Sequence, residues 1–443
     1  MLSLIGLILS LALLIFLTMR GINIIISAII CSIVVSVFGG LNLETALTKY
    51  YMDGFTGYFA SWFLVFMLGA IFGKVMHDTG TAESIAEWVS RTMGPKRAVF
   101  AVVAACAIMT YGGVSLFVVG FSVYPIAVSL FKKANLPHRF IPGALVFGSV
   151  SFTMTSPGSP EIQNLIPTQY FHTNTVAGGW IGFAMGFIIM ILGGLWLGRM
   201  VSKAVKNGET FSLPEGANVT VLDEKGAAEV SATLDTSEKV LPHWLTSLLP
   251  LVGVIVCLNI LSRFISSTSS ALISLFLGII LTWLLNIKFV SKVWSSLAAG
   301  TQNALVAAAN TCAVVGFGSV VGKTTAFTQI VNSFVHVPGY IGLAIAVTVI
   351  CGITGSASGG LGIALPILAP LYMAKGLDPG AMHRISSLAS GGLDSMPHNG
   401  YIVTTIRTIC GETHKRSYKP IFLLSVILPT AVLVLAVILY SIF

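Results

Sequence analysis

Long apolar stretches separated by short polar ones make up most of this chain. An apolar helix of about 20 residues crosses the hydrocarbon core of a bilayer, and the pattern predicts such helices in several places. The predicted spans are 2–19, 22–40, 58–76, 177–199, 243–262, 268–286, 297–322 and 419–443. The chain is therefore expected to be an all-α polytopic membrane protein. The first span lacks a basic start and a small-residue cleavage site, so it is interpreted as a retained helix.

Two apolar regions are too long for a single crossing. Residues 97–131 would form a helix of about 50 Å, whereas the hydrocarbon core measures about 30 Å. A flexible sequence, YGGVS at 111–115, lies in the middle, and basic residues flank both ends. Residues 339–376 repeat the arrangement around the small-residue run 354–360. Because two basic ends belong on one side of the membrane, each region is predicted to be a re-entrant hairpin.

Each predicted hairpin is followed by an apolar segment that proline interrupts. Residues 139–172 contain SPGSP at 156–160, and residues 380–410 contain SMPHNG at 395–400. Proline lacks the backbone amide and clashes with the preceding helical turn, so neither segment can be one continuous helix. Irregular backbone at membrane depth persists only inside protein or beside a watery cavity. The two breaks are therefore expected to border a binding site.

The two halves of the chain carry these features in the same order. The motif GxxxGK occurs at 69–74 and again at 318–323, and each copy precedes a helix expected to lie along the interface, 81–93 or 325–337. Each half should then contribute three spans, a hairpin, a broken helix and a final span.

Five crossings per half would give about ten crossings in all, and an odd number inverts the second half relative to the first. The predicted division is a first repeat at 1–200, a polar cytoplasmic linker at 201–242 and a second repeat at 243–443.

Basic residues favour one orientation of this arrangement. With both termini outside, in the periplasm, most lysines and arginines fall on the cytoplasmic side, as the positive-inside rule requires. The basic residues left outside are Lys49, Arg263, Lys323, Lys375 and Arg384. No basic residue is predicted at the centre of the bilayer.

Composition agrees with a membrane protein and excludes several other classes. Of the 443 residues, 55% are hydrophobic and 9% are charged, whereas soluble domains carry about 25% charged residues. The net charge of +8 lies in short loops, so it sets orientation and does not indicate nucleic-acid binding. The six cysteines lie in separate apolar segments without ligand spacing, so no disulfide framework, metal site or cofactor is expected.

Two carboxylates stand beside the predicted breaks. Glu161 follows the first break and Asp394 precedes the second, whereas nearly all other acidic residues lie in loops, interfacial helices or the linker. An intramembrane carboxylate by default marks an ion or proton pathway, so both are candidates for proton coupling. His398 is a third candidate, because histidine titrates near neutral pH. The alternative for each residue is a structural hydrogen bond at a helix break.

The hairpin tips and breaks also present free backbone amides and small polar side chains. Helix N-termini bind anions without a lysine or arginine, so a carboxylate substrate could be held there; alternatively, these small residues only permit tight packing. The predicted substrate-binding residues are Tyr111, Gly112, Gly113, Ser115, Ser156, Gly158, Ser159, Gln163, Asn164, Ser356, Ser358, Gly359, His398 and Asn399.

Three segments resemble the gluconate permease family of bacterial proton symporters: LGAIFGK at 68–74, YGGVSLFV at 111–118 and PHNG at 397–400. The likeness runs over essentially the whole chain and is greatest for the D-β-hydroxybutyrate permease branch. The family belongs to the ion transporter superfamily, so the resemblance implies inverted repeats, an elevator motion and a homodimer in the bacterial inner membrane.

Departures from the family pattern bear on the substrate. Gluconate transporters carry a His- and Pro-rich run at the first break, whereas 155–161 here reads TSPGSPE; this difference favours a smaller hydroxy acid. Neither tip has the Ser-Asn-Thr of sodium-coupled dicarboxylate carriers. The prediction is proton-coupled symport of a short hydroxy-monocarboxylate, 3-hydroxybutyrate, with no enzymatic activity.

Several alternatives stay open. Within the same class, the protein could be a gluconate-like or dicarboxylate symporter, possibly sodium-coupled. A passive anion channel is a second possibility, and saturable concentrative uptake would exclude it. An intramembrane enzyme would need a nucleophile with its base or metal ligands at helical spacing, and the sequence shows neither.

Overall fold

The computed structural model describes residues 2–20, 22–214, 240–291, 293–335, 337, 339–397 and 399–443. These residues form helices and no strand, which confirms the predicted all-α class. Within them, seven helices are long and apolar enough to cross a membrane, and shorter apolar helices accompany these seven. Most of the predicted linker and His398, a predicted site residue, lie outside the described residues.

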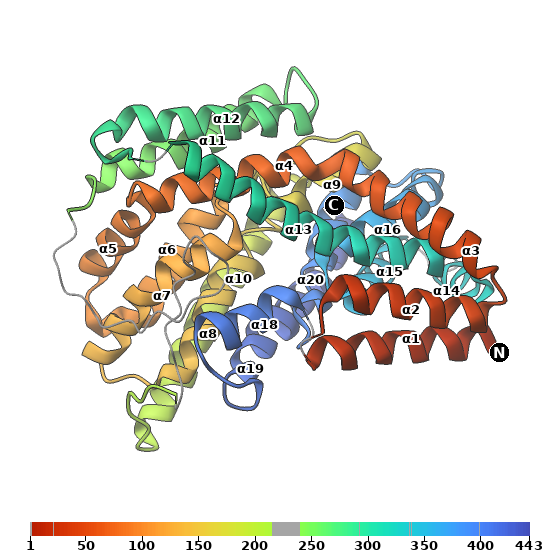
Figure 1. The fold of residues 1–443 in the computed structure, drawn as a ribbon, viewed down its shortest axis with the longest axis horizontal. Coiled ribbons are helices and arrows are strands. Elements are labelled where there is room, and N and C mark those ends of the chain that lie inside the picture. Colours follow the sequence, from red (N-terminus) through yellow and green to blue (C-terminus); the bar gives the residue numbers. More distant parts are fainter. Residues whose placement is uncertain are drawn as a thin grey trace.

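Two long helices cross the middle of the molecule (Figure 1): α4 (Met52–Asp78) and α13 (Val293–Val321). Glycines on α13 let their backbones approach closely, because a Cβ on Gly300 would lie 2.7 Å from the Ile71 Cα and one on Gly316 would lie 2.8 Å from the Tyr51 oxygen. Residue 300 meets residue 71 and residue 316 meets residue 51, so the two helices run antiparallel. Small residues serve such close helix contacts in membranes.

Further helices pack around this central pair. Helix α2 (Ile24–Gly39) contacts α1 (Leu2–Met19) and α13, and α12 (Ser267–Leu285) contacts α11 (Trp244–Leu261) and α4. In Figure 1, α1 and α2 lie at one end of the molecule, and α11 and α12 lie along another edge. The other α-helices outside the hairpins and the broken segments are α3 (Leu43–Thr45), α5 (Thr81–Met93), α10 (Gly179–Lys206), α14 (Thr325–Val335), α19 (His414–Phe422) and α20 (Leu428–Ile442).

Both regions predicted to be hairpins fold into two helices that contact each other. The first comprises α6 (Ala98–Tyr111) and α7 (Leu116–Lys133), and the second comprises α15 (Gly339–Thr354) and α16 (Ala357–Met373). The chain reverses at Gly113 (φ +94°) in the first and at Gly355 (φ +59°) in the second. Positive φ values are strained for residues that carry a Cβ, so glycine at each tip follows from the geometry of the reversal.

The two proline-containing segments are interrupted in the structure. The first comprises α8 (Ile141–Val146), a π-helical turn to Ser151, irregular backbone, and α9 (Ile162–Phe171). The second comprises α17 (Pro379–Ser390), a short 3-10 turn, and α18 (Gly400–Val403), which continues as a π-helical turn to Ile409. Hairpin and broken segment thus follow in the same order in both halves. The division into inverted repeats at 1–200 and 243–443 remains a prediction.

The GxxxG motifs help to bring the central helices against the hairpins. A Cβ on Gly73 of α4 would lie 3.0 Å from Val118 of α7, and one on Gly318 of α13 would lie 2.0 Å from Ile363 of α16. Each central helix therefore contacts the hairpin of its own half through a glycine of its motif.

Candidate functional site

A cavity of about 1090 Å³ lies between the central helices, the hairpin tips and the two breaks. Its wall includes Gly113 and Ser115 at the first tip, and 354–358 at the second. Glu161 and Asp394 border it at the two breaks. The four interrupted segments therefore meet at one space.

Four helices begin at this cavity. The residues that precede their first turns are Ser115 before α7, Glu161 before α9, Ser356 before α16 and Asn399 before α18, and all four line the cavity. The first backbone amides of a helix have no partner within the helix, and they carry partial positive charge. Four such ends facing one cavity make it suited to an anion.

The second tip and the second break are joined directly. Asn399 Nδ2 donates to the Gly355 oxygen at 3.0 Å, and Asn399 Oδ1 accepts from the Ile402 amide at 3.0 Å. Ser356 Oγ accepts from the Gly359 amide at 3.1 Å. At the first break the corresponding contact is apolar, since Gly113 packs against Pro160. Each tip therefore rests on the break of its own half.

The two carboxylates differ in their surroundings. Asp394 is 4% exposed, and its Oδ1 accepts a hydrogen bond from Ser395 Oγ at 2.9 Å. Glu161 is half-buried, and among the described residues no side chain or amide donates to its carboxylate. Glu161 is thus left free to exchange a proton or to contact a ligand in the cavity.

The structure brings part of the predicted site together. The predicted residues that line the cavity are Gly113, Ser115, Glu161, Gln163, Ser356, Ser358, Asp394 and Asn399. Gln163 is 8% exposed, and its Oε1 is buried with no hydrogen-bond partner among the described residues. This oxygen is therefore an unsatisfied acceptor on a residue of the cavity wall.

Other predicted substrate-binding residues lie outside the lining: Tyr111, Gly112, Ser156, Gly158, Ser159, Asn164 and Gly359. Gly112 packs against Leu251 of α11, and the Gly359 amide is used in capping α16. Ser156 Oγ donates back to the Phe152 oxygen. These polar groups are used within the protein, and the part of these residues in substrate binding stays a prediction.

Several of these outlying residues hold the first break in shape. Tyr111 Oη donates to the Pro157 oxygen at 2.6 Å, and the Gly158 amide donates to the Thr175 oxygen at 2.8 Å. Asn164 is fully buried, and its Nδ2 donates to the oxygens of Ser159 at 2.8 Å and of Thr175 at 2.9 Å. These contacts fix the loop that leads into α9.

Several cavity residues on α13 were not among the site residues predicted from the sequence. Gln302, Asn303, Asn310 and Thr311 of α13 line the cavity. Asn303 and Asn310 are seven residues apart, a spacing that places two side chains on one face of a helix. That spacing is a signal that could have identified them.

The cavity extends to the end of α4 that is predicted to be cytoplasmic. Lys74 and His77 of α4, with Glu83 and Glu87 of α5, line this part, and His77 Nδ1 lies 2.6 Å from Glu83 Oε1. Lys74 Nζ forms a salt bridge with Asp78 Oδ1 at 2.8 Å. Within the described lining, Lys74 is the one lysine or arginine, so no such side chain lines the cavity beside the tips and breaks.

Arg384 differs most from expectation. The charge distribution predicted that Arg384 lies on the outer side of the membrane, away from the bilayer interior. In the structure Arg384 belongs to α17, and its side chain is fully buried. It contacts the first break and the loop between α9 and α10.

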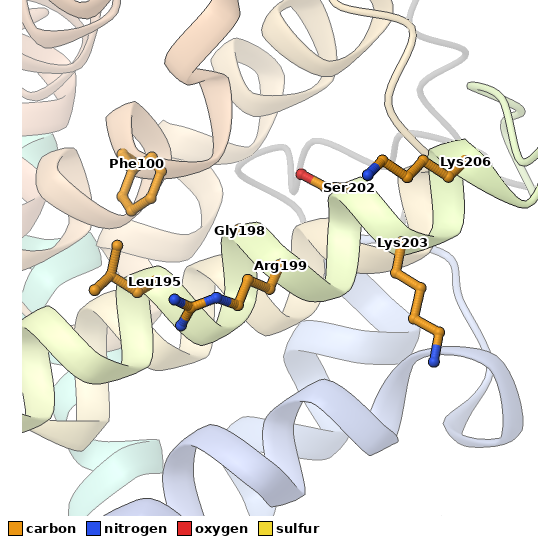
Figure 2. A pocket seen from close by; sticks show the side chains of 7 residues that line it. All are labelled: Phe100, Leu195, Gly198, Arg199, Ser202, Lys203 and Lys206. Carbon is orange, nitrogen blue, oxygen red and sulfur yellow. The ribbon is translucent and has the colours of Figure 1, made fainter.

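A second, shallower pocket of about 480 Å³ lies at the predicted inner end of α10. Its basic residues are Arg199, Lys203 and Lys206, and Figure 2 shows the two lysines extending from α10 in different directions. Phe100 and Leu195 form its apolar part. These cations do not converge on one point, so the pocket lacks the arrangement found in the large cavity.

Comparisons with known proteins agree with a transporter. The sequence profile described as GntP family permease matches residues 2–376. An uncharacterized transporter of Bacillus subtilis, YxjC, is 36% identical over 97% of both chains. A low-affinity gluconate transporter of Escherichia coli K12 is 26% identical over 44% of both chains.

A solved structure shares the fold. The YdaH transporter of Alcanivorax borkumensis superposes with a TM-score of 0.54, over 89% of this chain and 87% of that chain, at 16% identity. At that identity the likeness concerns the fold alone. From the family profile and the full-length relative, the chain belongs to the GntP permease family and is a multi-pass membrane transporter.

Proposed function

We propose that this protein is a proton-coupled symporter of a short hydroxy-monocarboxylate, 3-hydroxybutyrate, in the bacterial inner membrane. The observation that carries the proposal is the meeting of four helix N-termini at one cavity, at Ser115, Glu161, Ser356 and Asn399. Such ends attract a carboxylate, and no lysine or arginine lines the described part of the cavity beside them.

The polar side chains around these ends suit a hydroxylated acid. The buried Oε1 of Gln163 has no described partner, and Ser358 and Asn310 line the same cavity. A buried amide that lacks its hydrogen bond is costly, so a substrate hydroxyl that donates to Gln163 would be favoured. The low-affinity gluconate transporter among the relatives also acts on a hydroxy acid by its name.

Coupling is assigned to Glu161 and Asp394. Both carboxylates line the substrate cavity, and intramembrane carboxylates serve proton pathways. A proton bound by either one would offset the negative charge that a substrate carboxylate brings into the cavity. His398 stays a third candidate by its sequence position alone.

Movement of the hairpin tips and the breaks would move the substrate cavity from one side of the membrane to the other. In this proposal the hairpins and broken segments form the moving part, and α1, α2, α4, α11, α12 and α13 form the scaffold. The extension of the cavity toward His77 and Glu87 corresponds to an inward-open state in the predicted orientation. An elevator motion, a homodimer and periplasmic termini complete the proposal.

Uptake into proteoliposomes tests the function. An inward proton gradient should drive saturable accumulation of labelled 3-hydroxybutyrate, and unlabelled gluconate and succinate should compete weakly. Accumulation driven by a sodium gradient but not by a proton gradient would refute the coupling. Strong competition by gluconate would move the assignment to the sugar-acid transporters, and non-saturable flux would indicate a channel.

A further inference from the structure

Arg384 is a buried arginine whose hydrogen bonds all go to neutral groups. Its Nε and Nη2 donate to the Ala177 oxygen at 3.1 and 2.9 Å, and its Nη1 donates to the Thr155 oxygen. Nη2 also donates to Asn164 Oδ1 at 3.0 Å and to the Thr175 oxygen at 3.4 Å. One guanidinium therefore ties α17 of the second half to both sides of the first break.

The charge of Arg384 has no acidic partner among the described residues, since none of their ion pairs includes it. A guanidinium remains protonated in proteins, and burial of an unpaired charge is costly. Carbonyl oxygens offset part of that cost. The positive charge itself remains, and it acts on whatever lies nearby in a medium that screens weakly.

The guanidinium lies directly behind the cavity wall. Its acceptors Thr155 and Asn164 adjoin Met154 and Gln163, which both line the cavity. The Asn164 amide donates to the Glu161 oxygen at 2.9 Å, so Asn164 connects Arg384 to the first turn of α9. The guanidinium is thus bonded to residues that are sequence neighbours of the cavity wall, close to the space where four helix N-termini meet.

Glycines at the start of α10, Gly178 before the helix and Gly182 within it, leave room for this side chain. A Cβ on Gly178 would lie 2.4 Å from the Arg384 Cβ, and one on Gly182 would lie 3.0 Å from its Nε. The surrounding backbone is therefore shaped to the arginine along its length, which makes Arg384 part of a built arrangement.

We propose that Arg384 is a positioning residue of the substrate site, which orients the N-terminus of α9 toward the cavity and supplies positive charge that favours a carboxylate there. The inference rests on the proposed transport of a carboxylate. It explains how the cavity favours an anion although no lysine or arginine lines its central part.

Transport kinetics of Arg384→Gln and Arg384→Lys test this inference, with Arg263→Gln, an exposed outer arginine, as the control. The Gln variant should raise KM for the carboxylate about tenfold or more with a smaller change in maximal rate, and the Lys variant should recover part of the loss. Inhibition by the neutral amide of the substrate should change less than about twofold, because that molecule carries no charge. A purely structural role would lower protein yield and rate without this difference between charged and neutral molecules.

Asn164→Asp is a second test of the inference, to be used if the Arg384→Gln variant does not fold. Aspartate keeps an oxygen for Nη2 and places a negative charge beside the guanidinium, but it loses the bonds that Asn164 Nδ2 donates to the oxygens of Ser159 and Thr175. The carboxylate KM should again rise about tenfold, while inhibition by the neutral amide should change less than about twofold. A carboxylate KM within about twofold of the parent protein in a folded Gln or Asp variant overturns the inference. If the parent protein itself shows no saturable carboxylate transport, the proposed function fails, and the inference fails with it.

Discussion

His138 Nδ1 lies 2.9 Å from Glu412 Oε1, although the two residues are 274 positions apart in the chain. Both side chains are fully buried, and Tyr124 Oη lies 3.1 Å from the other ring nitrogen of His138. His138 stands just before α8, and Glu412 follows the π-helical turn that ends at Ile409. Arg384 makes the reciprocal connection, from α17 to the loop after α9. Each broken segment is thus tied at its start to the loop that ends the other.

Loss of this contact should destabilise the protein strongly. Glu412→Ala leaves His138 buried without its hydrogen-bond acceptor, and an unsatisfied buried group costs about 1–3 kcal/mol. The free energy of unfolding in detergent would measure the effect. Arg139→Gln is the matched control, because the Arg139–Glu209 pair is partly exposed and such pairs contribute about 0–1 kcal/mol. Equal losses of unfolding free energy in the two variants would contradict a larger contribution from the buried His138–Glu412 contact.

Stability should also depend on pH through Glu412. Burial alone would raise the pKa of Glu412, but the hydrogen bond with His138 and the charge of Arg416 outweigh it and hold the pKa below its ordinary value of 4.5. A carboxylate with a depressed pKa stabilises the folded state above the unfolded pKa, and that contribution is lost as pH falls through the folded pKa. As pH falls from about 5 through the folded pKa, the parent protein should therefore lose more stability than Glu412→Gln. Parallel losses in denaturation curves would refute this.

Neutral replacements of the cavity carboxylates should separate coupling from binding. Asp394→Asn and Glu161→Gln retain hydrogen-bonding capacity but cannot carry a proton. At least one should reduce proton-driven accumulation by about 100-fold while retaining exchange of labelled for unlabelled substrate. Glu44→Gln, at an exposed residue, should behave as the parent protein. Full accumulation in both Asp394→Asn and Glu161→Gln would exclude these carboxylates as proton carriers.

The sequence was sufficient to locate the interruptions but not to say which side chains face the cavity. Glycine at 113 and 355 and proline at 157, 160 and 397 mark chain reversals and breaks through local sterics, which act within a few residues. The direction of a side chain at a break depends on what packs behind it. Asn164 faces Arg384, and Gln163, its neighbour, faces the cavity. Periodicity does not decide between such neighbours in the first turn of a short helix, where the direction of the helix depends on what packs behind it.

Contacts between segments far apart in the chain could not be predicted from the sequence, for a related reason. Nothing local to His138 indicates Glu412, and nothing local to Arg384 indicates the carbonyl oxygens of the loop after α9. The charge of Arg384 favoured an outer loop by the positive-inside rule. Its buried position depends on acceptors supplied by the other half of the chain, which a single sequence does not pair.

Asn259 of α11 should stabilise the state seen here. Its Nδ2 donates to the Gly158 oxygen at 3.1 Å, and its Oδ1 accepts from Thr175 Oγ1 at 2.9 Å. These bonds join α11 to the first break and must separate if the break moves against the scaffold. Asn259→Ala should then favour the alternative state by about 1–3 kcal/mol.

Labelling measures that shift. A single cysteine at Ser115, in a variant without the native cysteines, should react faster with an impermeant maleimide from the outer side when Asn259 is also replaced. Asn42→Ala, which removes an exposed cap of α3, serves as the control. Unchanged labelling in Asn259→Ala would show that these bonds do not distinguish the two states.

The polar face of α13 should contribute to substrate selection. Asn303 and Asn310 line the same cavity as the helix N-termini, so we expect the hydroxyl group of a bound substrate to contact α13 or Gln163. Asn310→Leu should raise KM for 3-hydroxybutyrate about tenfold and leave inhibition by butyrate nearly unchanged, because butyrate lacks the hydroxyl group. Combined replacement of Arg199, Lys203 and Lys206 by glutamine, in the shallow pocket of α10, should leave both values as in the parent protein. A tenfold KM effect from that pocket instead would place substrate recognition on α10, because changes of that size follow from lost contacts with the substrate.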